Sequence, residues 1–123
     1  MREYCALLRG FNFQADATQL SVTLAWEALQ ASAVSYRVFV HLLAADGRIV
    51  AQSDGEPANW QYPTTAWLPG DFILDAHSLT LPPGLPSGDY GLIAGLYEPV
   101  SGARLESADH QTYQRLLTWR NAP

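Results

Sequence analysis

Large aromatic side chains gather in one unusual stretch of the sequence, residues 53–72, which reads SDGEPANWQYPTTAWLPGDF. This stretch contains Trp60, Tyr62 and Trp67 together with three prolines and two glycines, and it has no strand pattern. A connection of this length inside a small domain is usually functional or is ordered by packing onto the rest of the fold. The three rings are therefore either ligand contacts or anchors that hold the loop in place.

Polar residues on a neighbouring hairpin stand beside this stretch. If the Asp46-Gly47 turn closes the hairpin, His41 lies opposite Gln52 and diagonal to Asp54 on one face. The same register pairs Val40 with Ser53, Leu42 with Ala51, Ala44 with Ile49, and Leu43 with Val50. A contact between His41 and Asp54 is either a polar site on the sheet or a structural hydrogen bond. In the structural interpretation, the aromatics of the 53–72 loop cover Phe39, Leu43 and Val50.

The chemistry of these side chains suits a carbohydrate. The apolar C–H surfaces of a sugar stack on aromatic rings, while carboxylate, amide and imidazole groups exchange hydrogen bonds with its hydroxyl groups. We expect any ligand site to be a shallow carbohydrate-binding surface formed by Trp60, Tyr62, Trp67, Asp54, Gln52 and His41.

Metal sites are not indicated by the spacing of the candidate ligands. His41, His77 and His110 lie far apart in the sequence, and zinc sites usually draw on ligands at close, regular intervals. Cys5 is the single cysteine, so it forms no internal disulfide, and its apolar surroundings favour a small buried side chain. We expect no metal.

Catalysis by this chain is also not expected. The carboxyl groups of Asp54, Glu56, Asp71 and Asp75 could in principle bind calcium or form a glycosidase pair, but no EF-hand is present and little chain remains for a substrate cleft. The sequence contains no nucleophile elbow, phosphate-binding glycine loop or dinucleotide fingerprint. We therefore expect no cofactor.

The charge balance argues against two classes of partner. Twelve acidic residues outnumber seven arginines, there is no lysine, and the formal net charge is −5. This balance removes the general attraction to nucleic acids and anionic membranes. No apolar run is long enough to span a membrane, so we expect no direct membrane insertion.

Alternation of apolar and polar residues with period two dominates the rest of the sequence and predicts short strands. We expect strands near 4–14, 19–28, 35–44, 48–54, 72–81, 89–98, 103–108 and 112–119. Such a set predicts an all-β, antiparallel immunoglobulin or fibronectin-III-like sandwich of about 7–9 strands, with residues 1–123 forming one domain. The apolar phase predicts a core of Leu20, Val22, Leu24, Trp26, Val38, Val40, Leu42, Tyr90, Leu92, Ala94 and Leu96.

The segment Leu85-Pro86-Ser87-Gly88-Asp89-Tyr90 is typical of the entry to a late strand of such a sandwich. A tyrosine at this place commonly forms a corner by donating a hydrogen bond to the preceding loop. The paired cysteines of antibody domains are absent, so the likeness extends only to the general architecture.

A series of motifs carries a family resemblance over about residues 26–105. It comprises Tyr36-Arg37-Val38-Phe39-Val40-His41-Leu42, Asp46-Gly47, Ala51-Gln52-Ser53-Asp54, Pro57, Tyr62-Pro63-Thr64-Thr65, Trp67, Pro69-Gly70, Asp75, Gly88-Asp89-Tyr90, Gly95-Leu96-Tyr97 and Gly102-Ala103-Arg104-Leu105. Their order resembles the C-terminal soluble β-sandwich domain of bacterial multi-pass membrane glycosyltransferases similar to dolichyl-phosphate-mannose protein mannosyltransferases. Two departures are Asp71, where glutamate is expected, and Ala58-Asn59-Trp60, where a glycine-rich turn is expected.

This resemblance implies a context and no activity of the chain's own, because the catalytic machinery of such enzymes resides in the membrane part. We expect an extracytoplasmic accessory domain, part of a longer membrane protein, that binds or positions a glycan or acceptor. The expected partners are a carbohydrate and the transmembrane part of the parent protein. The alternative is a purely structural sandwich that packs on other protein and binds no sugar.

Overall fold

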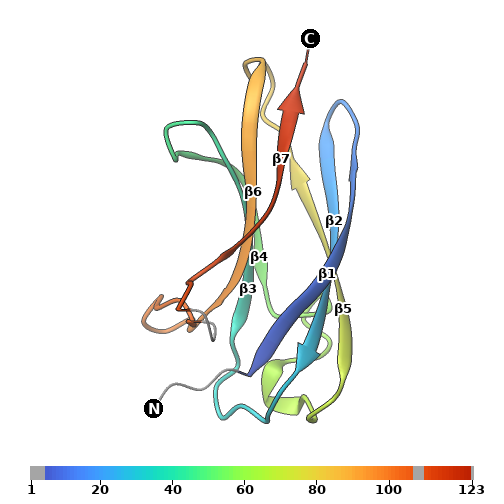
Figure 1. Cartoon of the computed structure of the whole chain (residues 1–123), viewed down its shortest axis with the longest axis vertical. Coiled ribbons are helices and arrows are strands. Elements are labelled where there is room, and N and C mark those ends of the chain that lie inside the picture. Colours follow the sequence, from blue (N-terminus) through green and yellow to red (C-terminus); the bar gives the residue numbers. More distant parts are fainter. Residues whose placement is uncertain (1–4, 107–109, 123) are drawn as a thin grey trace.

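The alternating segments form strands in the computed structural model, which describes residues 5–106 and 110–122 (Figure 1). The elements are β1 (Ala6–Ala15), β2 (Gln19–Ala28), β3 (Arg37–Leu43), β4 (Ile49–Gly55), a 3-10 turn (Thr64–Ala66), β5 (Phe72–Thr80), β6 (Gly88–Tyr97) and β7 (Gln114–Asn121). No helix in these ranges is long and apolar enough to cross a membrane.

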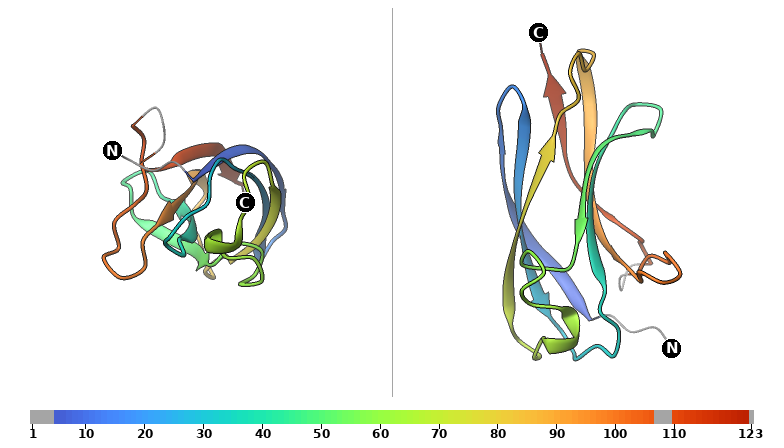
Figure 2. Two further views of the ribbon diagram at one scale, coloured as in Figure 1. Left: turned by 90° about the horizontal axis from the view of Figure 1, so that it is seen from below. Right: turned by 180° about the vertical axis from the view of Figure 1, so that it is seen from behind.

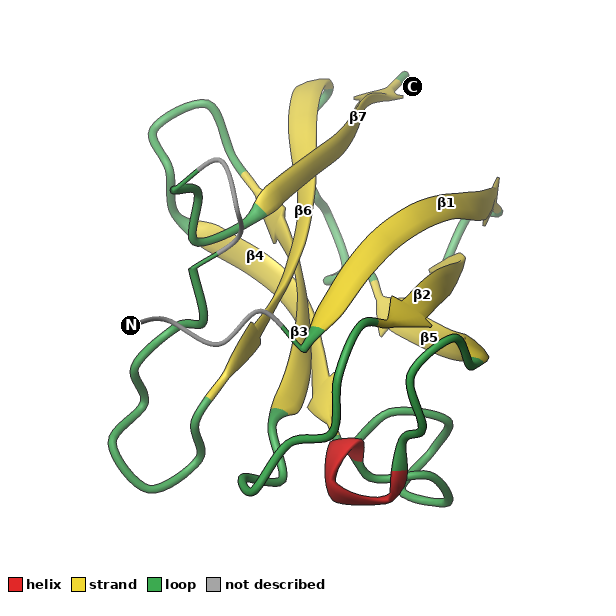
Figure 3. Cartoon of the chain, turned by 60° about the horizontal axis from the view of Figure 1, so that its bottom comes forward, coloured by secondary structure: helices red, strands yellow, loops and turns green. Residues whose placement is uncertain are grey.

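Two antiparallel sheets face each other, one with the strand order β1-β2-β5 and one with the order β4-β3-β6-β7 (Figures 1 and 2). This confirms the predicted all-β antiparallel sandwich and a strand number within the predicted range. The long loop between β4 and β5 lies at one end of the sandwich and contains the 3-10 turn, which is red in Figure 3.

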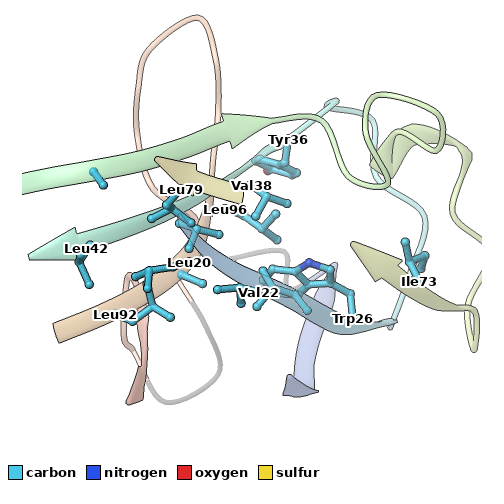
Figure 4. Packing of buried hydrophobic residues seen from close by; sticks show 14 of the residues in the cluster. Leu20, Val22, Trp26, Tyr36, Val38, Leu42, Ile73, Leu79, Leu92 and Leu96 are labelled. Carbon is cyan, nitrogen blue, oxygen red and sulfur yellow. The ribbon is translucent and has the colours of Figure 1, made fainter. Parts of the chain in front are cut away.

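The interior is filled by the apolar phase of the strands. Every side chain that the alternation assigns to the core is buried, and Figure 4 shows several of them meeting between the sheets. Trp67, Ile73 and Leu79 add to the core from the long loop and from β5. Cys5 is buried as expected, with 1% of its surface exposed.

The β3–β4 hairpin has the predicted register over most of its length. Its pairs include Val40 with Ser53, His41 with Gln52, and Leu42 with Ala51. A bulge after Leu42 then pairs Leu43 with Ile49, so the predicted pairs of Leu43 with Val50 and of Ala44 with Ile49 are wrong. One extra residue near a hairpin turn bends the strand without changing the pairing before it.

The predicted strand at 103–108 is not formed over the part of it that the structure describes. Only an isolated bridge joins Arg104 to Tyr97, and residues 107–108 lie outside the described ranges. A single bridge fits this segment because Gly102 has a left-handed φ of 75° immediately before it. Residues 103–106 therefore follow a turn and pair with β6 at one position only.

The tyrosine corner at the start of β6 is confirmed. Tyr90 is buried, and its hydroxyl donates a 2.6 Å hydrogen bond to the backbone carbonyl of Pro86. Asn121 donates to the same carbonyl and to that of Leu85, so the end of β7 is tied to the same loop.

A pair of leucine truncations tests the phase of the core. Leu24 is fully buried, whereas Leu74, on the outer face of β5, is 70% exposed. We expect Leu24→Ala to lower the free energy of unfolding by about 2–5 kcal/mol, because it removes buried methyl groups and leaves a cavity. Leu74→Ala should change it by less than about 0.5 kcal/mol. Urea unfolding measures both, and equal effects would contradict the assigned faces.

Candidate functional site

The hairpin brings the three predicted polar residues together on the outer face of the four-stranded sheet. His41 pairs with Gln52, and its Nε2 lies 3.4 Å from Oδ1 of Asp54. The predicted proximity of His41 and Asp54 is therefore confirmed. The contact is longer than a good hydrogen bond, and neither ring nitrogen has a hydrogen-bond partner among the described residues.

The surroundings of His41 favour its neutral form. Burial is the largest influence and lowers the pKa of the imidazole, and the Arg104 guanidinium lowers it further. The Asp54 carboxylate acts in the opposite direction and is outweighed. Since only 7% of His41 is exposed, this residue offers little surface to a ligand, and its role is the contact with Asp54.

The side chain over Phe39 differs from the expected one. Phe39 is only 2% exposed, and the Arg104 guanidinium lies 4.3 Å from the centre of its ring. A Cβ added at Gly95, which pairs with Phe39, would meet that ring at 2.5 Å. The residue covering Phe39 is thus an arginine from the segment after β6, and the prediction of loop aromatics here is wrong. Pairing alone could not show that a later segment crosses this face.

Trp67 is an anchor of the long loop. It is 1% exposed, belongs to the core, and its indole N–H donates a 2.8 Å hydrogen bond to the carbonyl of Tyr62. The buried hydroxyl of Thr64 fixes the same loop, because it donates to the Val34 carbonyl and accepts from the Tyr36 N–H. Trp67 consequently has no face to offer a ligand, which removes it from the predicted surface.

Tyr62 is half-buried and also serves the loop's own structure. Its hydroxyl donates a 2.5 Å hydrogen bond to Oδ2 of Asp71, which also accepts from the Leu68 N–H. The hydrogen bond from Tyr62 is the main cause that lowers the pKa of Asp71, and the same bond raises the pKa of Tyr62. This pair closes the loop just before β5 begins.

Trp60 is the aromatic residue of the loop that faces solvent, with 55% of its surface exposed. Its indole lies against Gly55 at the end of β4, where an added Cβ would stand 2.9 Å from Nε1. The Arg37 guanidinium lies 5.0 Å from the ring centre. The indole is therefore fixed by two neighbours while more than half of the residue stays open to a ligand.

The turn that presents Trp60 has an unusual backbone. Ala58, Asn59 and Trp60 have φ values of 56°, 55° and 69°, a left-handed conformation that favours glycine. These are the residues that stand where the family resemblance suggests a glycine-rich turn. Left-handed residues with a Cβ cost about 1–2 kcal/mol each, so the surrounding structure must hold this turn in place.

A buried carboxyl group supplies part of that hold. Asp75 is 1% exposed, its Oδ1 accepts a 3.0 Å hydrogen bond from the Ala58 N–H, and its Oδ2 accepts from the Trp26 indole at 3.3 Å. Nε2 of His77 lies 2.7 Å from Oδ2 as well. One carboxyl group thus joins the strained turn to the core of the three-stranded sheet.

His77 extends this network to the other sheet, since its Nδ1 lies 2.8 Å from Oγ of Ser53. A carboxylate only accepts hydrogen bonds, so the ring donates from Nε2, and Nδ1 of a neutral ring then accepts the Ser53 hydroxyl proton. This role of Asp75 and His77 was not predicted from the sequence. The alternation of β5 could have revealed it, because Asp75 and His77 share the inward phase of Ile73 and Leu79.

The hydrogen-bonded chain from Ser53 through His77 to Asp75 contains the same side chains as the triad of a serine hydrolase, in which a histidine links a serine to a carboxylate. Such a serine must face a substrate and hydrogen-bond donors for an oxyanion. Here Asp75 and His77 are buried, and a cavity of about 230 Å³ lies elsewhere, lined in part by β1 and the start of β7. The contacts of this network tie the turn at Ala58 to Trp26 in one sheet and to Ser53 in the other.

Metal-binding geometry is absent from the described ranges, in which no three His, Cys, Asp or Glu side chains form a candidate group. His41 faces outward from β3, and His77 faces the core from β5. His110 lies in the segment between β6 and β7, where its Nδ1 is 2.8 Å from the Glu106 carboxylate.

Comparison with known proteins supports the fold alone. No family model matches the sequence, and no curated protein matches it. Among solved structures, a beta-glucuronidase from glycoside hydrolase family 2 is similar to this chain, with a TM-score of 0.55 and 11% sequence identity. The similarity covers 90% of this chain and 10% of the beta-glucuronidase chain. A sandwich of this kind thus occurs as a small part of a much longer protein.

Relief of backbone strain is expected from Ala58→Gly. Glycine adopts the left-handed conformation of this position without a Cβ penalty, so we expect the free energy of unfolding to rise by about 0.5–1 kcal/mol. Ala76→Gly, at an exposed and ordinary position of β5, should instead lower it by about 0.5–1 kcal/mol. Thermal and urea unfolding measure both variants, and a loss of stability in both would disprove the strain.

The Tyr62 hydroxyl should control the titration of Asp71. A folded-state pKa below the ordinary 3.8 contributes stability that is present above that value and is lost as the pH falls through the folded-state pKa. Tyr62→Phe should raise the pKa of Asp71 toward 3.8 and reduce this contribution at neutral pH. Carboxyl NMR titration measures the change, with Tyr113→Phe as the control. An unchanged Asp71 titration in Tyr62→Phe would refute the assigned cause.

Proposed function

We propose that this chain is a non-catalytic carbohydrate-binding module that holds a glycan or an acceptor against Trp60. The observation that carries the proposal is the exposed indole, which a strained turn presents between Arg37 and Gly55. The residue keeps 55% of its surface open while its ring is held in one orientation, so a ligand meets an aromatic surface that is already ordered.

Rigidity of the ring favours binding. The indole contacts Gly55 on one side and Arg37 on another, and the turn below it is tied to Asp75 by a 3.0 Å hydrogen bond. A side chain that is already ordered loses little conformational entropy when a ligand stacks on it. The apolar C–H face of a sugar ring is the matching surface.

Polar residues of β4 are the candidates for the hydrogen bonds that a sugar on this ring needs. Asp54 immediately precedes the Gly55 against which the indole lies, and both Asp54 and Gln52 are exposed. A carboxylate accepts hydrogen bonds from sugar hydroxyls, and an amide both donates and accepts. In this proposal Tyr62 and Trp67 hold the loop, and His41 supports Asp54.

The proposed context is an extracytoplasmic accessory domain of a membrane glycosyltransferase. The support for it is the ordered series of motifs that resembles the C-terminal domain of such enzymes, together with a sandwich fold that agrees with that resemblance. In this setting the module would lie beside the transmembrane part of the parent protein and keep a saccharide near it.

A second candidate is a structural sandwich that packs on other protein and binds no sugar. The observation that favours it is an apolar strip at the start of β5 and just before it, where Leu68, Phe72 and Leu74 are 64%, 66% and 70% exposed. Covering such side chains with protein removes apolar surface from water. This strip and Trp60 are separate features, so the two candidates are tested by different residues.

Titration with saccharides of bacterial cell envelopes, followed by NMR of the backbone and indole N–H groups, tests the first candidate. We expect shifts at Trp60 and at residues 54–61, with a Kd of about 1 mM, which corresponds to about −4 kcal/mol. Trp60→Ala should weaken binding at least tenfold. Phe72→Ala, which removes a ring of a residue that is 66% exposed on the other sheet, should leave it unchanged. If no saccharide shifts any resonance of this loop, the structural candidate takes its place.

A further inference from the structure

The arginines of this acidic chain fall into two groups. Among the described residues, three arginines contact carboxylates: Arg9 with Glu27, Arg48 with Asp46, and Arg120 with Asp89. The other three contact none in the described ranges, and all of them lie on the outer face of the four-stranded sheet: Arg37, Arg104 and Arg115. Although the chain has a net charge of −5, this face therefore carries positive charges that no described carboxylate neutralises through an ion pair.

Two of these arginines lie on opposite sides of Tyr97 on this face. Arg37 pairs with Tyr97 across β3 and β6, and Tyr97 in turn bridges to Arg104. Residues opposite each other on antiparallel neighbours project from the same face of a sheet. The two arginine Cα atoms are thus separated by two strand spacings, roughly 10 Å.

This row continues to the proposed saccharide site. The Arg37 guanidinium lies 5.0 Å from the Trp60 ring centre, and its Nε is buried without a hydrogen-bond partner among the described residues. At the other end, the Arg104 guanidinium rests on Phe39, whose ring packs on Gly95. Stacking on aromatic rings holds both guanidinium groups in place, and because Nε of Arg37 is buried, an anion would meet that group through its terminal N–H groups.

The carboxylates near this row form no ion pair with Arg37 or Arg104 among the described residues. Asp54 lies 3.4 Å from Nε2 of His41. Both carboxylate oxygens of Glu98 accept backbone N–H groups, from Val100 and Ser101. A hydrogen bond from the Ser101 side chain, together with these backbone hydrogen bonds, lowers the pKa of Glu98 and keeps its charge within its own turn. Neither acid neutralises the two guanidinium groups.

We propose that the Trp60 site selects anionic saccharides, with the sugar ring on the indole and its carboxylate or phosphate group on Arg37 and Arg104. This inference rests on the proposed saccharide function and specifies its ligand class. Guanidinium groups bind both anions through paired, charge-assisted hydrogen bonds, so the shared chemistry is an anionic group on a sugar.

Four probes at equal concentration test this inference on the intact chain: glucose, glucuronate, glucose 6-phosphate and inorganic phosphate. We expect glucuronate, glucose 6-phosphate or both to bind about tenfold more tightly than glucose, as judged by NMR shifts at Trp60, Tyr97 and the His41 ring. The stronger of the two identifies the preferred anion. Raising the salt concentration should weaken the anionic probes and leave glucose unaffected, because salt screens exposed charges.

Matched variants separate the two arginines from general charge effects. Arg37→Gln and Arg104→Gln should each reduce the affinity for the anionic sugar about tenfold, toward that of glucose. Arg115→Gln removes the same charge from the same face, but near Gly91 at the other end of β6, and should have no effect. Arg104→Lys, which keeps a cation over Phe39, should retain part of the affinity and shows that the fold is preserved.

The contradicting outcomes are distinct. If glucose binds as tightly as the anionic sugars, this inference is wrong and the saccharide function of Trp60 remains. If inorganic phosphate alone binds as tightly as glucose 6-phosphate, the sugar contributes nothing and the inference is also wrong. Should none of the sugars bind at Trp60, the proposed function fails as well.

Discussion

The buried carboxyl group of Asp75 is the interaction on which the rest of this site depends. It accepts hydrogen bonds from the indole of Trp26 in the core and from the backbone of Ala58 in the long loop, and His77 links it to Ser53 in the opposite sheet. A buried polar group is tolerated only when its hydrogen-bonding capacity is met, so these partners must be held together. This requirement fixes the loop relative to both sheets.

The long loop uses its aromatic residues for two different purposes. Trp67 enters the core and replaces the apolar side chains that a strand would otherwise supply at this end of the sandwich. Trp60 is turned outward by three left-handed residues, a conformation that costs free energy and is offset by the hydrogen bond to Asp75 and by packing on Gly55. Stability provided by the buried end of the loop thus supports an exposed ring at its other end.

The net charge of the chain does not show how its charges are distributed over the surface. The chain is acidic overall, yet the outer face of the four-stranded sheet holds arginines without carboxylate partners in the described ranges, next to aromatic rings. Burial above all, and Arg104 to a smaller extent, lowers the pKa of His41, so this face favours the neutral imidazole and avoids a further positive charge in its interior. The guanidinium groups are then the positive charges that this face presents to solvent.

Period-two alternation by itself determined the segments that form β1 to β7, the inward phase of the core and the sandwich, although it also indicated a strand at 103–108 that is not formed over its described part. It succeeds because burial of one face is a local property that each strand carries in its own residues. The Asp46-Gly47 turn similarly determined that His41 and Asp54 meet, since a short hairpin leaves little freedom of register. Only the tertiary structure decided that Trp60 faces solvent and Trp67 does not, and that Arg104 covers Phe39. Those outcomes depend on backbone dihedral angles and on contacts between residues distant in sequence, and neither leaves a periodic trace in the order of the amino acids.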